Sequence, residues 1–130
     1  MRNRTIIVYA FGAIVWAYQH AYSAEPDAKD KANIEFMIQK TRALYGNRAI
    51  TLAQPYKNRL IEYMPEGAHK EQIKKDHPIL WVDLGFLTCE MLDEGKREST
   101  LRTQLDSFYG PNVGRAAVQA AKDVICPKFK

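Results

Sequence analysis

The chain has 130 residues, of which 46% are hydrophobic, and its formal charge at pH 7 is +4. Two arginines belong to a predicted leader, and without them 17 basic residues face 15 acidic ones, a net charge of +2. This near balance argues against the clustered basic face of a nucleic-acid-binding domain. The remaining length suits one small domain that buries about two-thirds of its unfolded surface.

The N-terminus has the three-part pattern of a secretory signal peptide over residues 1–23. Two arginines lie in the first four residues, an apolar run covers residues 6–18, and small residues precede a cleavage site between Ser23 and Ala24. The apolar run is shorter than the roughly 20 residues of a transmembrane helix. An uncleaved anchor is the alternative, since the run ends in aromatic residues that suit a membrane interface. We expect a secreted or periplasmic protein whose residues 24–130 form one helical domain without stable membrane insertion.

Residues 27–45 have the apolar spacing of an amphipathic helix. Asp27 and Asp30 lie near its start, where carboxylates favour the helix dipole, and Gly46 follows its end. The predicted buried side consists of Ile34, Met37, Ile38, Thr41 and Leu44.

The next section, residues 48–75, is interrupted by Pro55. Proline lacks the N–H of a helix interior, so we expect a helix that begins near Pro55 rather than one that runs through it. Its predicted apolar side consists of Tyr56, Leu60, Ile61 and Met64. After a turn, residues 68–75 form a short charged helix with only Ile73 to bury.

A long apolar helix is predicted from Pro78 to residue 94, with Asp76 as its cap and Gly95 as its stop. It is apolar almost all round, which places it at the centre of a bundle. Its polar residues fall in one narrow stripe, the predicted solvent face: Asp83, Glu90 and Glu94.

Two shorter helices complete the chain. Ser99 is the predicted cap of a helix over residues 100–108, with Leu101, Leu105 and Phe108 inward. Asn112 is the predicted cap of an alanine-rich helix whose inner side consists of Val113, Ala117, Ala120 and Val124. No segment alternates apolar and polar residues as a strand does. The predicted fold is therefore all-α, a small bundle of four to five helices.

The chain contains two cysteines, Cys89 and Cys126. In an exported protein a single pair predicts one disulfide, which would hold the long helix against the end of the alanine-rich helix. Pro127 ends that last helix and biases Cys126 away from helical geometry, which turns its side chain inward. The alternative is a reactive thiol or half of a metal site.

The chain lacks the short motifs of serine hydrolases, zinc proteases and nucleotide-binding loops. A histidine between two glutamates in residues 66–71 suggests a weak metal site, but a solvated charged turn explains it better. Asp83, Glu90 and Glu94 could form an acidic triad, although catalytic carboxylates need burial or a like-charged neighbour to shift their pKa. We predict no catalytic, cofactor-binding or metal-binding residue.

Four features follow one another in the C-terminal half: C-x-x-L-x-x-G at Cys89, Leu92 and Gly95, a capped helix with Leu105, an alanine-rich helix with Ala116, Ala117 and Ala120, and a final Cys126-Pro127. In this order they resemble the domain of unknown function 732, a family of small secreted bacterial proteins, over residues 84–127. The resemblance implies export, a helical fold and the cysteine bridge, and it implies no activity. The family usually has tyrosine where this chain has Ile125.

The leading functional interpretation is a non-enzymatic exported helical protein that binds a protein or envelope partner and no nucleic acid. The alternative is a periplasmic inhibitor or immunity-type protein that binds a secreted toxin or enzyme through an exposed apolar or charged patch. A small hydrolase using Asp83 and Glu90 is a third interpretation, and it would need a cleft and perturbed carboxylates.

Overall fold

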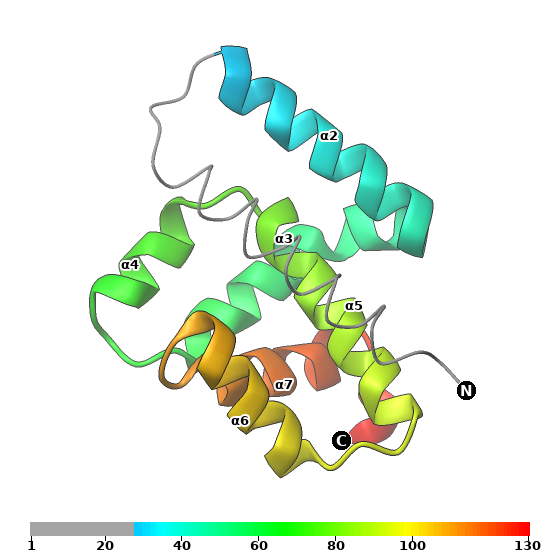
Figure 1. Cartoon of the computed structure of the whole chain (residues 1–130), viewed down its shortest axis with the longest axis vertical. Coiled ribbons are helices and arrows are strands. Elements are labelled where there is room, and N and C mark those ends of the chain that lie inside the picture. The colour runs from blue at the N-terminus through cyan, green and yellow to red at the C-terminus, as the bar shows by residue number, and fades with distance from the viewer. Residues whose placement is uncertain (1–27) are drawn as a thin grey trace.

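The computed structural model describes residues 28–130, and all regular elements in this part are helices joined by short turns (Figure 1). Its elements are α2 (Ala28–Tyr45), α3 (Asn47–Tyr63), α4 (Ala68–Lys75), α5 (Ile79–Asp93), α6 (Glu98–Tyr109), α7 (Val113–Val124) and the 3-10 helix η1 (Pro127–Phe129). The all-α prediction is confirmed, and six α-helices in the described part slightly exceed the predicted four to five. The predicted cleavage site at Ser23 and Ala24 lies outside the described residues.

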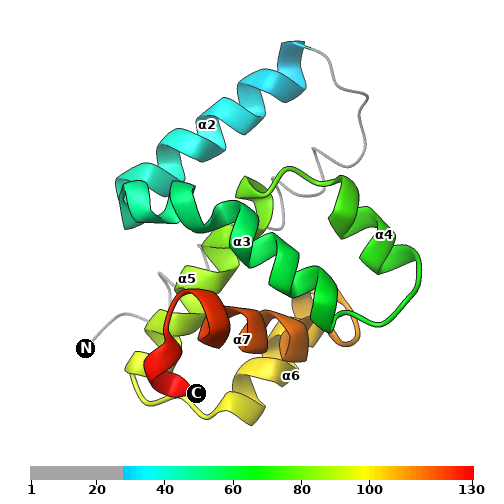
Figure 2. The same cartoon turned by 180° about the vertical axis from the view of Figure 1, so that it is seen from behind.

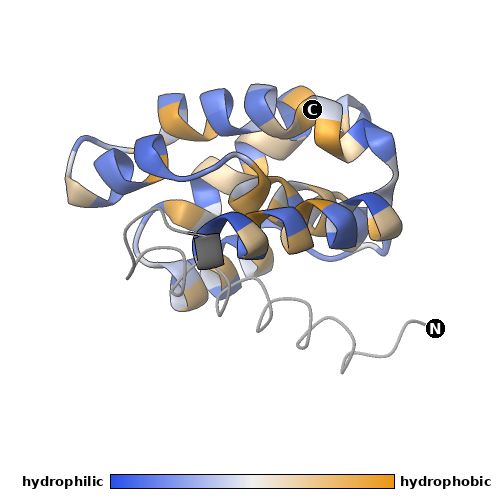
Figure 3. Cartoon of the chain, turned by 90° about the horizontal axis from the view of Figure 1, so that it is seen from above, coloured by the Kyte–Doolittle hydropathy of each residue, from blue (hydrophilic) through white to orange (hydrophobic). Residues whose placement is uncertain are grey.

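The core lies where α3, α5 and α7 pack against one another. Figures 1 and 2 show these three helices in the middle of the fold, with α6 against α7, α2 across one end of α3 and α5, and α4 to the side. Every residue from Ile79 to Thr88 is buried, which confirms α5 as the central helix. In Figure 3 the hydrophobic colour gathers toward the middle of the molecule and the outer turns are mostly hydrophilic.

α3 runs unbroken through Pro55, so the prediction of a new helix at that residue is wrong. The proline costs the helix one hydrogen bond, to the carbonyl of Thr51. Both residues are exposed, so the loss falls on the solvent side, where water replaces the bond. Buried side chains before and after the proline hold both halves of α3 against the core: Ala49, Ala53, Tyr56 and Leu60.

Asp83 does not lie on a solvent face, contrary to the prediction. It is 2% exposed and accepts a 2.6 Å hydrogen bond from the Thr41 hydroxyl of α2. α2 therefore covers this part of the polar stripe of α5, and the stripe reaches solvent only further along, at the partly buried Glu90 and the exposed Glu94. Helical periodicity gives the direction of a side chain but not the neighbouring helix that covers it.

Asp76 does not cap α5 as predicted. It ends α4, where its carboxylate accepts hydrogen bonds of 3.0 Å from Gln72 Nε2 and of 3.0 Å from Trp81 Nε1. His77 takes the capping role, because its Nδ1 accepts a 3.1 Å bond from the Ile79 N–H. The aspartate thus ties α4 to the central helix, and the histidine begins that helix.

Two apolar residues predicted to face inward are exposed: Leu44 is 59% and Phe108 is 46% exposed. Tyr109, one residue later, takes the inward place and is 8% exposed, with its ring 5.8 Å from that of Trp81. α6, which holds Phe108 and Tyr109, begins at Glu98, two residues earlier than predicted, so Ser99 lies inside the helix and does not cap it.

α7 begins after Asn112, which has the left-handed backbone of φ 71° but makes no capping bond with its side chain. Asp106 supplies the capping bond instead, because its Oδ1 accepts a 2.7 Å hydrogen bond from the Gly114 N–H. A Cβ at Gly114 would lie 2.1 Å from the carbonyl oxygen of Arg102, so only glycine allows α6 and α7 to come this close.

Candidate functional site: a groove beside the disulfide

Cys89 and Cys126 form a disulfide, as predicted, with their Cα atoms 6.0 Å apart. Gly85 lies one turn before Cys89, and a Cβ there would lie 2.6 Å from Tyr56 Cε2 and 2.6 Å from Ile125 Cδ1. The absence of a side chain on Gly85 therefore leaves room for other segments to come close to α5. The tyrosine of α3 and the isoleucine after α7 occupy that room, and the bridge holds α5 against the end of α7.

Cys126 points inward because α7 ends before it. The N–H groups of Ile125 and Cys126 both bond to the carbonyl of Ala121, at 2.8 and 2.9 Å. Cys126 then leaves helical geometry at φ −129°, and Pro127 follows as the first residue of η1. The result confirms the prediction that the frayed helix end buries this cysteine, which is 7% exposed.

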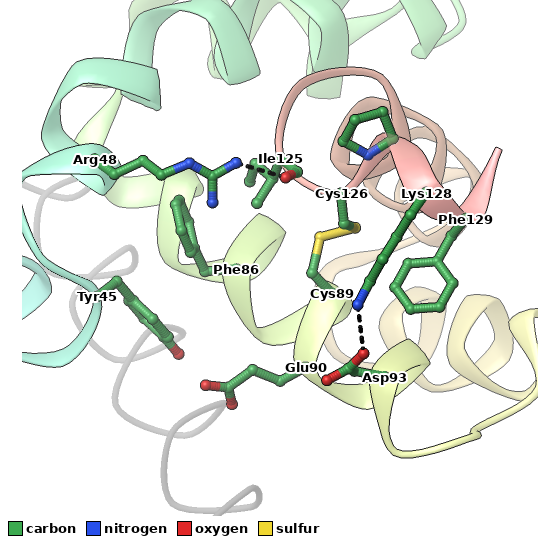
Figure 4. Close-up of a pocket in the computed structure, with 11 residues that line it drawn as sticks. Tyr45, Arg48, Phe86, Cys89, Glu90, Asp93, Ile125, Cys126, Lys128 and Phe129 are labelled. Carbon is green, nitrogen blue, oxygen red and sulfur yellow. Dashed lines mark hydrogen bonds and ion pairs between the residues drawn. A yellow bond between two sulfur atoms is a disulfide. The ribbon is translucent and has the colours of Figure 1, made fainter.

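A groove of about 390 Å³ opens beside the disulfide, between the end of α2, the start of α3, α5 and the C-terminal turn (Figure 4). We call it the disulfide groove. Its lining residues are Tyr45, Arg48, Phe86, Cys89, Glu90, Asp93, Ile125, Cys126, Pro127, Lys128 and Phe129. Four separate segments meet here, and the bridge fixes two of them relative to each other.

One wall of the groove is organised by Arg48. Its Nη2 donates a 2.7 Å hydrogen bond to the carbonyl of Ile125, and its guanidinium carbon lies 5.6 Å from the centroid of the Phe86 ring. The Phe86 ring in turn lies 5.0 Å from that of Tyr45. Within residues 28–130, Arg48 forms no ion pair with a carboxylate. The groove therefore presents a cation that is held in place but not neutralised.

Lys128 lies on the other side of the disulfide from Arg48 (Figure 4). Its Nζ forms a 2.8 Å ion pair with Asp93 and lies 5.0 Å from the centroid of the Phe129 ring. Glu90 adds a second carboxylate from the same helix as Asp93. The α5 side of the groove is therefore acidic. Lys128, which faces it from η1, is already paired with one of these carboxylates.

The three carboxylates of the predicted acidic stripe are not brought together as one site. Only Glu90 lines the disulfide groove. Burial raises the pKa of Asp83 to about 6. The hydrogen bond from Thr41 and the charge of Lys40 lower this pKa, but their effect is smaller than that of burial. Asp83 thus has a perturbed carboxyl, but it is enclosed beneath α2 and serves to hold that helix.

The residues of the suggested weak metal site also separate. Glu66 pairs with Lys70 at 2.8 Å and Glu71 pairs with Lys74 at 2.9 Å. The ring of His69 packs beside the turn after α6, where a Cβ on Gly110 would lie 3.1 Å from it. Within the described residues no three side chains of the metal-binding types form a cluster.

Sequence analysis did not identify the groove itself. Arg48 lies 38 residues before Phe86 and 77 before Ile125 in the chain, and no local pattern links them. The one available signal was the cysteine pair, because a predicted bridge places the residues around Cys89 beside those around Cys126.

No protein-family profile, curated protein or solved structure matches the chain. Within residues 28–130, no helix is both long enough and apolar enough to cross a bilayer. Function is therefore inferred from the groove, the disulfide and the exposed surface of the described helices.

Proposed function

We propose that the protein is an exported, non-enzymatic helical domain that binds its partner in the disulfide groove. The observation that carries this proposal is the groove itself, a concave surface with a floor of Phe86, Ile125 and the bridge and a positioned cation at its edge. Preformed apolar concavities with a few placed polar groups are the usual form of ligand sites. A covalent bridge in the floor limits the rearrangement that binding would require.

The composition of the groove supports binding rather than catalysis. None of its lining residues is a serine, threonine or histidine, and both of its cysteines are joined to each other. Nucleophilic catalysis needs a nucleophile within hydrogen-bond reach of a base. The hydrolase interpretation needed Asp83 and Glu90 on one accessible face. α2 covers Asp83, and Glu90 alone of the two lines the groove.

An envelope extract passed over the immobilised protein tests this proposal. We expect the wild type to retain a component that the Arg48→Glu variant does not retain, because the reversed charge removes the positioned cation. Arg59→Glu is the matched control, the same change on the same helix at an exposed residue that pairs with Glu62. Equal retention by both variants, or no retention by the wild type, would contradict binding in the groove.

Export is proposed from the leader pattern and is supported by the disulfide, since such bridges persist in oxidising compartments. The resemblance to the domain of unknown function 732 supports the same proposal, because that family is secreted. The intact mass of protein recovered outside the cytoplasm should correspond to a chain that begins at Ala24, within a residue or two. Recovery of a full-length chain from the membrane fraction would show instead that the leader is kept as an anchor.

An inhibitor or immunity-type role is the second candidate, and the outer face of α2 favours it. Phe36 is 64% and Leu44 is 59% exposed on a helix whose main packing, among the described elements, is on α3 and α5. Exposed large apolar side chains suit a protein partner. In the retention experiment, loss with Phe36→Ser but not with Arg48→Glu would favour this second role.

A further inference from the structure

We propose that the disulfide groove binds the C-terminal residue of a peptide whose last side chain is apolar. The proposal rests on the groove being the binding site, as inferred above, and adds the chemistry of the ligand. It assigns the terminal carboxylate to Arg48, the last side chain to the apolar floor, and the peptide N–H groups to the acidic side of α5.

The carboxylate assignment follows from the state of Arg48. A guanidinium has five N–H donors in a rigid fork that matches a carboxylate. Arg48 uses its Nη2 on the carbonyl of Ile125 and stacks on Phe86, which leaves donors available and the group oriented. A cation fixed before binding loses less side-chain entropy when a ligand arrives. Lys128 is the weaker choice, because Asp93 already neutralises it.

The floor between the charged groups is apolar. Phe86 and Ile125 are only 8% and 5% exposed. The open apolar surface therefore belongs to the bridge at Cys89 and to the partly buried rings of Tyr45 and Phe129. An apolar side chain placed here would cover that surface. A ligand that carried only an anion, such as inorganic phosphate, would leave this floor in water.

The acidic side of the groove favours a peptide over a fatty acid. Asp93 and Glu90 line the groove from α5, and a carboxylate has about four acceptor positions. Asp93 uses Oδ1 on Lys128, so its other acceptor positions can take N–H groups. A peptide end supplies N–H donors for this side, whereas an alkyl chain would place methylenes against two carboxylates.

The size of the groove limits the length of the ligand. Its volume of about 390 Å³ is near the lower end of the range of roughly 300–1,000 Å³ for ligand sites. One or two residues of a peptide fit this space better than a long segment does. Recognition of a chain end, with its single carboxylate, agrees with that size.

The test is an NMR titration of the full exported domain with N-acetyl-phenylalanine and with its amide, which differs only in lacking the carboxylate. We expect the acid to bind at the groove and the amide to bind about tenfold or more weakly, because a charge-assisted pair is lost. The Arg48→Gln variant should lose this preference, and the Arg59→Gln variant should keep it. N-acetyl-glycine should bind more weakly than N-acetyl-phenylalanine, because it leaves the floor uncovered.

Three results would overturn the inference. Equal binding of N-acetyl-phenylalanine and its amide would show that Arg48 does not recognise the carboxylate. Binding of hexanoate as tight as that of N-acetyl-phenylalanine would assign the site to fatty acids. Absence of binding by both phenylalanine probes, while the envelope component is still retained through Arg48, would leave the groove as the binding site with a different ligand. Failure of both experiments would reject the proposed function as well.

Discussion

Replacing either cysteine with serine should lower the free energy of unfolding by roughly 2–5 kcal/mol, the range for native disulfides of small secreted domains. The bridge joins residues that are 37 apart in sequence, and the chain-entropy estimate for such a loop is roughly 3–4 kcal/mol. This is a large part of the total stability of a small domain. Without the bridge, the turn at Cys126 would be tied to α7 through the carbonyl of Ala121 but would have no covalent link to α5.

The double variant should be hardly less stable than either single variant, because each single change already removes the whole bridge. Urea unfolding of the three variants, together with peptide mapping under non-reducing conditions, measures this directly. Additive losses in the double variant would show that the two cysteines contribute separately. Free thiols in freshly isolated protein would contradict the bridge itself.

The second large effect concerns Asp83, whose replacement by asparagine should stabilise the protein at neutral pH. Burial raises the pKa of this carboxyl to about 6 from the ordinary value of 3.8. Between these values the folded state holds more protons than the unfolded state, so stability falls as pH rises through this window. Above it, the charged carboxylate costs up to about 3 kcal/mol. Asparagine avoids this cost and can still accept the hydrogen bond of Thr41.

The measurement is the free energy of unfolding of wild type and Asp83→Asn from pH 3.5 to pH 8. We expect a gain of roughly 1–3 kcal/mol for the variant at pH 7 that disappears below about pH 4. Burial also lowers the pKa of His77 and raises that of Asp76, and both contributions cancel in the difference between the two proteins.

Asp93→Asn is the matched control, because Asp93 lies on the same helix and its side chain is 63% exposed in its pair with Lys128. It should change stability by at most about 1 kcal/mol at every pH. A variant at position 83 that is less stable than wild type at pH 7 would show that the charged carboxylate is compensated in the folded state.

Local chemistry determined much of the helical layout. Gly46 and Gly95 end the helices before them with positive φ angles of 80° and 90°, which glycine adopts without the steric cost of a Cβ atom. The apolar composition of residues 79–88 made α5 the central helix, because no other position hides a helix that is apolar all round. The disulfide could be predicted because a chain with two cysteines offers one pairing.

Only the tertiary structure decided which surfaces are covered. Pro55 stays inside α3 because its missing hydrogen bond faces solvent, and Asp83 is buried because α2 lies over it. The groove arises only when Arg48 reaches Ile125 across 77 residues of sequence. Periodicity describes the angle of a side chain around its own helix, whereas burial and binding depend on which distant segment packs against that angle.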